Sequence, residues 1–140
     1  MSSFALNRFL QAQEFVYENA LREIKSGRKH THWIWFIFPQ LQGLGTSEMA
    51  CLYGINGLEE AREYLAHPIL SDRLTQICEA LLTHKGENAC DILGDIDAMK
   101  VRSSMTLFAL ISEEGSVFHQ VLDCFYGSQP DMLTLKLAKE

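Results

Sequence analysis

Apolar residues recur every three or four positions over most of this chain, which is the spacing of one face of an α-helix. The first such stripe follows Asn7, a candidate N-cap, and stops at Gly27, a residue type that ends helices in the left-handed conformation. Its apolar members are Phe9, Leu10, Val16, Tyr17, Ala20, Leu21 and Ile24. We therefore expect a single amphipathic helix that begins at Asn7 and ends before Gly27.

Further stripes with helical spacing follow, and capping residues separate them. The predicted helices cover residues 48–53, 58–65, 89–93, 98–111 and 117–126, with a further helix from Pro68 that Lys85-Gly86 ends and a final helix after Asp131 that runs to the C-terminus. Ser47, Ser116 and Asp131 are placed to cap three of them, and Asp95 or Asp97 to cap the helix over 98–111. The chain has no internal repeat and no linker long enough to divide it. The pattern predicts one all-α domain over residues 1–140, with seven or eight short helices in a compact, non-bundle arrangement.

The least ordinary stretch is residues 33–38, six apolar residues in succession that include both tryptophans. Aromatic and β-branched residues favour a strand. No second convincing strand occurs to pair with it, however, and an unpaired buried strand leaves backbone groups unsatisfied. We expect a short buried helical turn that ends at Phe38, because the residue before Pro39 is held extended. Gly43 and Gly45 then permit a tight turn.

Composition and charge limit the classes of function. The 140 residues are 47% hydrophobic and 21% charged, as in an ordinary globular domain. The net charge of −6 argues against a large nucleic-acid surface, which is usually basic. No apolar run approaches the length of a membrane span, and residues 1–4 lack the start of a signal peptide. We expect a cytoplasmic protein without membrane or nucleic-acid partners.

The four cysteines, Cys51, Cys78, Cys90 and Cys124, form no C-x-x-C pair and lack the spacing of a disulfide framework. Each lies in a half-apolar helical context. We expect four buried or half-buried thiols, which suits a reducing compartment.

Several motifs resemble those of a known family. Residues 32–47 read HWIWFIFPQLQGLGTS, and the likeness continues at YGI (53–55), EAREYLAHP (60–68), Arg73-Leu74 and KVRSSMTLF (100–108). Together they resemble the small, mostly bacterial proteins of the domain-of-unknown-function family "eighteen-ten", sometimes labelled calpastatin-like without a mechanism behind the label. The resemblance covers essentially the whole chain. It implies one all-helical domain and brings no catalytic residue.

Polar candidate residues lie together on the predicted helix over 98–111. Lys100, Ser103 and Ser104 lie at i, i+3 and i+4 and therefore share a face. A serine one turn from a lysine is an arrangement of a nucleophile and its base; the alternative is small residues that let another helix approach. Arg102, with Lys100 near a helix N-terminus, suits a phosphate or carboxylate, whereas surface arginines more commonly pair with acidic residues.

The aromatic block supplies the other candidates. His32 heads it and suits an acid–base or stacking role in a pocket lined by Trp33 or Trp35. The Gln40 amide can both donate to a ligand and accept from it, or tie down the loop. Tryptophans can stack on a base or sugar, although such residues are more often core. His30 and His32 have no third ligand nearby, so we expect no metal, and no cofactor either.

Three functions fit these residues. The first is binding of a polar, phosphorylated or nucleotide-like small molecule between the aromatic block and the helix at Lys100. The second is a hydrolase or glycosyl-transferring enzyme in the same cleft, with His32 or Lys100 in acid–base roles. The third is a protein-interaction module without chemistry. If the two segments form one site, His32, Gln40 and at least two of Lys100, Arg102, Ser103 and Ser104 should line one concave pocket. The sequence does not decide the oligomeric state.

Overall fold

The structure is a computed structural model that describes residues 5–139. Residues 1–4, on which the signal-peptide prediction rests, and residue 140 lie outside the described part. Ten α-helices occur in the described part: α1 (Asn7–Gln13), α2 (Tyr17–Ser26), α3 (Ile34–Ile37), α4 (Glu48–Tyr53), α5 (Gly57–Ala66), α6 (Pro68–Leu82), α7 (Ala89–Leu93), α8 (Asp95–Leu110), α9 (Val117–Tyr126) and α10 (Met132–Ala138).

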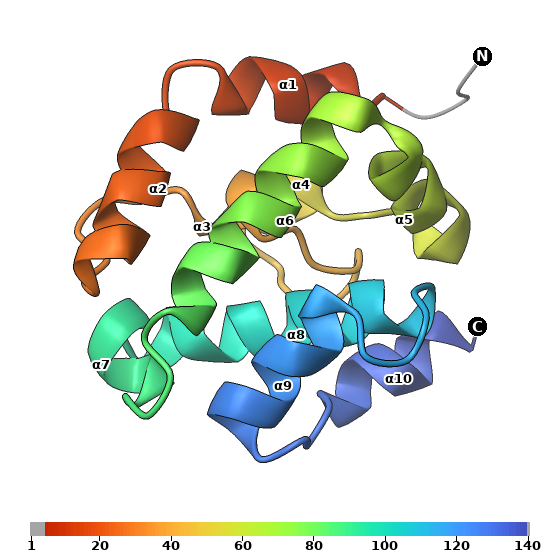
Figure 1. Cartoon of the computed structure of the whole chain (residues 1–140). Coiled ribbons are helices and arrows are strands. Elements are labelled where there is room, and N and C mark those ends of the chain that lie inside the picture. The colour runs from red at the N-terminus through yellow and green to blue at the C-terminus, as the bar shows by residue number, and fades with distance from the viewer. Residues whose placement is uncertain (1–4, 140) are drawn as a thin grey trace.

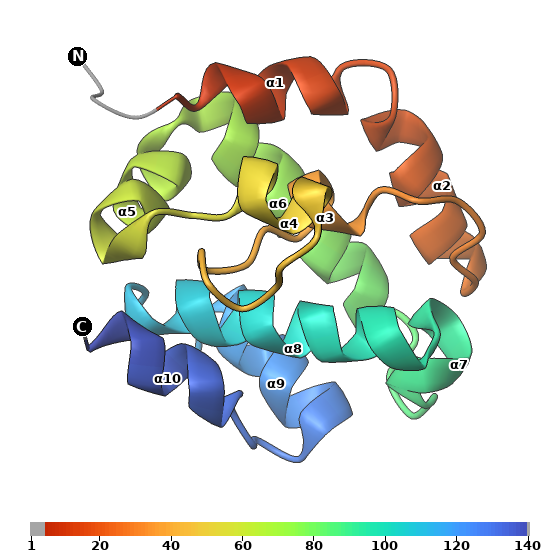
Figure 2. The same cartoon turned by 180° about the vertical axis from the view of Figure 1, so that it is seen from behind.

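The prediction of an all-α fold is confirmed, with more helices than the seven or eight expected. Within residues 5–139 there is no strand, and only one isolated bridge joins Leu41 to Ile55. The aromatic block forms the short helix α3, as predicted. Figure 2 shows α3 near the middle of the molecule, in front of α6, with the loop after it lying along α8.

The predicted side-chain caps of three helices are confirmed. The Ser47 hydroxyl accepts a hydrogen bond from the Ala50 amide at the start of α4. Ser116 and Asp131 accept in the same way at the starts of α9 and α10. These caps were predictable because each depends only on residues within one helical turn.

The prediction of a single N-terminal helix is wrong. The stripe divides at residues 14–16 into α1 and α2, and Asn7 is the first helical residue without acting as a side-chain cap. The division has a tertiary cause, because α1 packs on α3 whereas α2 packs along α6. Figure 1 shows the two helices meeting at an angle, which one straight helix cannot reproduce.

Helix α8 starts earlier than predicted. It begins at Asp95 rather than Ala98, and neither Asp95 nor Asp97 caps it, since the N-cap position is Gly94 without a side-chain bond. Gly94 has φ 87° and ψ 156°, a conformation open essentially to glycine alone. Ile96 and Asp97 therefore belong to the same helix as Lys100.

A row of contacting aromatic rings connects helices from the two halves of the chain. Phe9 on α1 meets Tyr64 on α5 at 5.1 Å between ring centroids, and Tyr64 meets Phe108 on α8 at 5.4 Å. Phe108 in turn lies 5.6 Å from Phe118 on α9. Three of these four rings are fully buried and Phe118 nearly so, so this row is the centre of the core.

The prediction for the cysteines is wrong at two positions. All four are free, but Cys51 and Cys90 are exposed, whereas Cys78 is buried and Cys124 half-buried. Helix α4 buries none of its residues, and in α7 Cys90 falls on the exposed side, away from the buried Ala89, Ile92 and Leu93. Among the described residues, no helix has the length and apolar character that crossing a membrane requires.

Candidate functional site

The buried carboxylate of Glu23 on α2 fixes the start of the aromatic block. It accepts hydrogen bonds from the backbone amides of His30 at 2.7 Å and Thr31 at 3.0 Å, and from the Trp33 indole at 3.0 Å. Burial raises the pKa of Glu23, but the hydrogen bonds from Thr31, His30 and Trp33 outweigh it and lower the pKa to about 2. The ionised carboxylate therefore holds the loop before α3 in one conformation.

This anchoring separates the two tryptophans. Trp33 is fully buried, so its proposed role as a ligand platform is wrong and it belongs to the core. Trp35 is only half-buried, and the Lys100 ammonium lies 5.2 Å from its ring centroid. The buried Trp35 indole N–H has no hydrogen-bond partner among the described residues. Of the two rings, Trp35 is the one that reaches the surface beside α8.

Three adjoining hollows surround this contact. One of about 550 Å³, which we call the His32 depression, includes His32, Trp35 and Lys100 in its lining. A second of about 450 Å³, the Gln40 depression, includes Gln40, Lys100 and Ser103. A third, of about 10 Å³, touches both Trp35 and Gln40. Trp35, Gln40 and Lys100 therefore each line two of the three hollows, and we call the two large depressions together the Lys100 cleft.

The predicted meeting of the two segments occurs, although not in one pocket. His32 and Gln40 lie in different depressions, and Lys100 is the predicted residue common to both. Ser103 lines the Gln40 depression, but it is 6% exposed and its hydroxyl donates to the Met99 carbonyl at 3.2 Å. The hydroxyl is thus engaged with its own helix and not with Lys100, which weakens the idea of a serine–lysine nucleophile.

Arg102 and Ser104 do not reach the cleft, which corrects their assignment as site residues. The Arg102 guanidinium donates to the carbonyls of Gln129 at 2.8 Å and Pro130 at 3.0 Å, so it holds the segment between α9 and α10. Ser104 is fully buried, and its hydroxyl has no partner among the described residues. Ser104 is therefore closed to a ligand, and the Arg102 guanidinium is engaged with backbone carbonyls away from the cleft.

Two large apolar residues of α8 after Ser104 have partners on other helices. The Met105 sulfur lies 3.6 Å from that of Cys78, and the Phe108 ring packs between Tyr64 and Phe118. At the surface, α8 meets the aromatic block where the Lys100 ammonium lies over the Trp35 ring.

Comparison with protein-family models matches residues 3–138 to a family described as "Protein of unknown function (DUF1810)". The chain belongs to this family. The same fold occurs in the crystal structure of the conserved hypothetical protein Rv1873 from Mycobacterium tuberculosis, with a TM-score of 0.96 and 41% identity over 99% of both chains. A comparison with curated proteins found no match. Neither description names a ligand or a reaction.

Sequence reasoning missed two residues of the site in this DUF1810 chain. The Lys29 ammonium lies 2.7 Å from the Asp97 carboxylate and 4.8 Å from the Trp33 ring centroid, and both charged residues line the His32 depression. Asp97 also lies 3.9 Å from the Lys100 ammonium. The sequence could have indicated Asp97, because it lies three residues before Lys100 and so on the same side of the helix. No local pattern links Lys29 to Asp97 or to Lys100.

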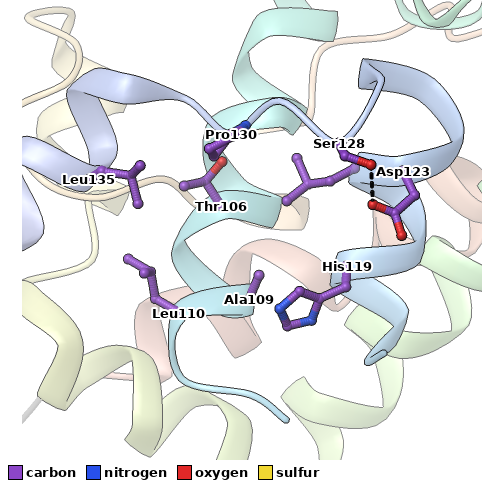
Figure 3. A pocket seen from close by; sticks show the side chains of 9 residues that line it. Thr106, Ala109, Leu110, His119, Asp123, Ser128, Pro130 and Leu135 are labelled. Atoms are coloured by element: carbon purple, nitrogen blue, oxygen red, sulfur yellow. Dashed lines mark hydrogen bonds between the residues drawn. The ribbon is translucent and has the colours of Figure 1, made fainter. Parts of the chain in front are cut away.

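A separate hollow of about 270 Å³ lies between α8, α9 and α10 and contains none of the predicted site residues (Figure 3). Its walls are mainly apolar, with Leu110 and Leu135 facing each other across it. Its polar groups are engaged locally: the Ser128 hydroxyl donates to Asp123 at 2.6 Å, and the His119 Nδ1 lies 2.7 Å from the Ser116 hydroxyl. The Lys100 cleft therefore offers more groups for recognising a polar ligand. Among residues 5–139, no three His, Cys, Asp or Glu side chains are placed to hold a metal ion.

Proposed function

We propose that this protein binds a small anionic molecule, of the phosphorylated or nucleotide-like class, in the Lys100 cleft. The observation that carries the proposal is the position of Lys100, whose ammonium lies over Trp35 and lines both depressions. A lysine ammonium is a compact point charge that suits phosphate oxygens. Concave sites with a few convergent polar groups are where small ligands bind.

Lys100 is the more available of the two lysines. The Lys29 ammonium is paired at 2.7 Å with Asp97 and donates to the Thr31 carbonyl, and its side chain is 6% exposed. The Lys100 side chain is 28% exposed, and its ammonium lies 3.9 Å from the same carboxylate. A ligand anion can therefore take Lys100 as a partner without breaking a short ion pair.

The remaining groups determine the kind of anion. The Gln40 backbone is fixed, because its carbonyl accepts from the Ile55 amide at 2.8 Å, and its side-chain amide can both donate and accept. The N-terminal end of α8 adds partial positive charge. Asp95 and Asp97 line the His32 depression and oppose an anion there. This balance favours one phosphate group over a triphosphate.

We also propose that the protein is cytoplasmic, and its four free thiols support a reducing compartment. The net charge of −6 supports a small-molecule ligand over a nucleic acid.

A thermal-shift series with inorganic phosphate, AMP and glucose 6-phosphate tests the proposal. Binding to the folded state alone adds about 2.7 kcal/mol at a ligand concentration of 100 Kd, which raises the Tm by several degrees. We expect at least one of the three to raise the Tm of the wild-type protein and of Lys25→Met, but not of Lys100→Met. Lys25 is exposed and lines none of the three hollows, so this control removes the same charge away from the cleft. Equal shifts in all three proteins, or none in any, would contradict the proposal.

A further inference from the structure

The Gln40 depression has an apolar wall that the binding of a phosphate does not require. Eight large hydrophobic side chains are exposed among the described residues, and three of them line this depression: Ile96 at 72%, Met99 at 69% and Leu133 at 49%. Single exposed hydrophobics are ordinary on a protein surface. Three that converge on one hollow beside a lysine form a recognisable binding surface.

The geometry of α8 explains how this wall arises. Ile96, Met99, Lys100 and Ser103 lie at i, i+3, i+4 and i+7, so they form one continuous stripe along the helix. A separate stripe, which includes Val101 and Met105, is fully buried in the core. Helix α8 therefore has a second, partly apolar face, which lines the Gln40 depression.

We infer that the ligand of the Lys100 cleft is amphipathic, with an anionic head on Lys100 and an apolar tail over Ile96, Met99 and Leu133. This inference rests on the proposed function and narrows its ligand class. Ile96, Met99 and Leu133 all line the Gln40 depression, and Ile96 also lines the His32 depression beside Lys29 and Asp97. Because Lys100 lines both depressions, an anionic head on its ammonium leaves an attached tail within reach of these apolar side chains.

Two polar side chains that line the Gln40 depression, Asp131 and Ser47, are already engaged in helix caps. The Asp131 carboxylate accepts from the Thr134 amide at 2.9 Å and from its hydroxyl. The Ser47 hydroxyl accepts from the Ala50 amide at 3.1 Å. Hydroxyl groups placed directly against Ile96, Met99 and Leu133 would lose water without gaining hydrogen-bond partners from these side chains, which is costly. An alkyl or aryl tail has no hydrogen bonds to water to lose, and the flexible Met99 side chain can adapt to the shape of the tail.

Isothermal titration of the full chain with methyl, butyl and hexyl phosphate tests the inference, because the series holds the head group constant. Each fully buried methylene strengthens binding about fourfold. For a partly open cleft we expect butyl phosphate to bind about tenfold more tightly than methyl phosphate, and hexyl phosphate more tightly still. Met99→Gln should remove most of this gain. Met132→Gln, at an exposed methionine that does not line the depression, should leave the gain intact.

The outcomes separate this inference from the proposed function. If methyl phosphate binds in a Lys100-dependent way and the longer chains add nothing, the amphipathic inference is wrong and the proposed function stands. If no phosphate ester binds, both fail. If hexanol binds as tightly as hexyl phosphate, independently of Lys100→Met, the surface is an apolar docking face and the inference is overturned. Binding to phosphatidic acid vesicles without binding of hexyl phosphate would also overturn it, since the occupant would then be a membrane surface.

Discussion

Replacing Glu23 by glutamine should loosen the aromatic block from α2, because this carboxylate accepts five hydrogen bonds. Four come from the backbone amides of His30 and Thr31, the Thr31 hydroxyl and the Trp33 indole, and the fifth comes from the Asn19 amide. A glutamine would place its own N–H groups against some of these donors. Buried donors left without an acceptor are costly.

The magnitude follows from the pKa of Glu23, which folding lowers from 4.5 to about 2. A shift of this size corresponds to about 3 kcal/mol of stability at neutral pH. Because the pKa is lowered on folding, this contribution is fully present above pH 4.5 and is lost as the pH falls toward 2. By pH 3 about 2 kcal/mol of it should be gone.

Urea denaturation of wild type and Glu23→Gln between pH 7 and pH 3 measures this contribution. The wild type should be more stable by about 3 kcal/mol at pH 7, and the difference should shrink as the pH falls. Glu114→Gln removes the same charge from an exposed turn and should have almost no effect at any pH. A Glu23→Gln difference below 0.5 kcal/mol (well under the roughly 3 kcal/mol expected), or one independent of pH, would refute the role assigned to Glu23.

Three further predictions concern stability and exposure. Trp33→Ala should cost about 3–5 kcal/mol in urea denaturation, and Trp35→Ala clearly less because that ring is half-exposed; equal costs would contradict their different burial. Gly94→Ala should lower stability by about 1–3 kcal/mol, measured by thermal melting, through backbone strain alone since no atom lies within 4 Å of the added Cβ. Iodoacetamide should label Cys51 and Cys90 in the native protein and Cys78 only in urea, as read by mass spectrometry; native labelling of Cys78 would contradict its burial, which also raises its thiol pKa.

The helices were predictable where their signals are local. The caps at Ser47, Ser116 and Asp131 and the short helix at 89–93 depend on neighbouring residues only, and the structure confirms them. The break between α1 and α2 was not predictable, because the apolar stripe continues through it. That break depends on where α3 and α6 lie, which is a property of the whole fold.

The candidate site was predictable only in part, for a reason of helical geometry. Successive residues turn by about 100° around a helix. Relative to Lys100, Ser103 is therefore displaced by about 60° toward the cleft stripe, whereas Ser104 is displaced by about 40° toward the core. Arg102 lies almost on the far side. Sharing a face with Lys100 was correct for both serines, but one turn after Lys100 the Ser103 side of the helix lines the Gln40 depression and the Ser104 side is buried in the core.

The two tryptophan indole N–H groups allow the central claim to be tested by one measurement. In a ¹H–¹⁵N spectrum of the protein they give two side-chain signals, one from buried Trp33 bonded to Glu23 and one from Trp35 beneath Lys100. Titration with methyl phosphate should shift the Trp35 signal, leave the Trp33 signal in place, and have no effect on either in Lys100→Met. A Trp35 signal that does not move at saturating ligand, or that moves equally in Lys100→Met, would contradict anion binding at the Lys100 cleft.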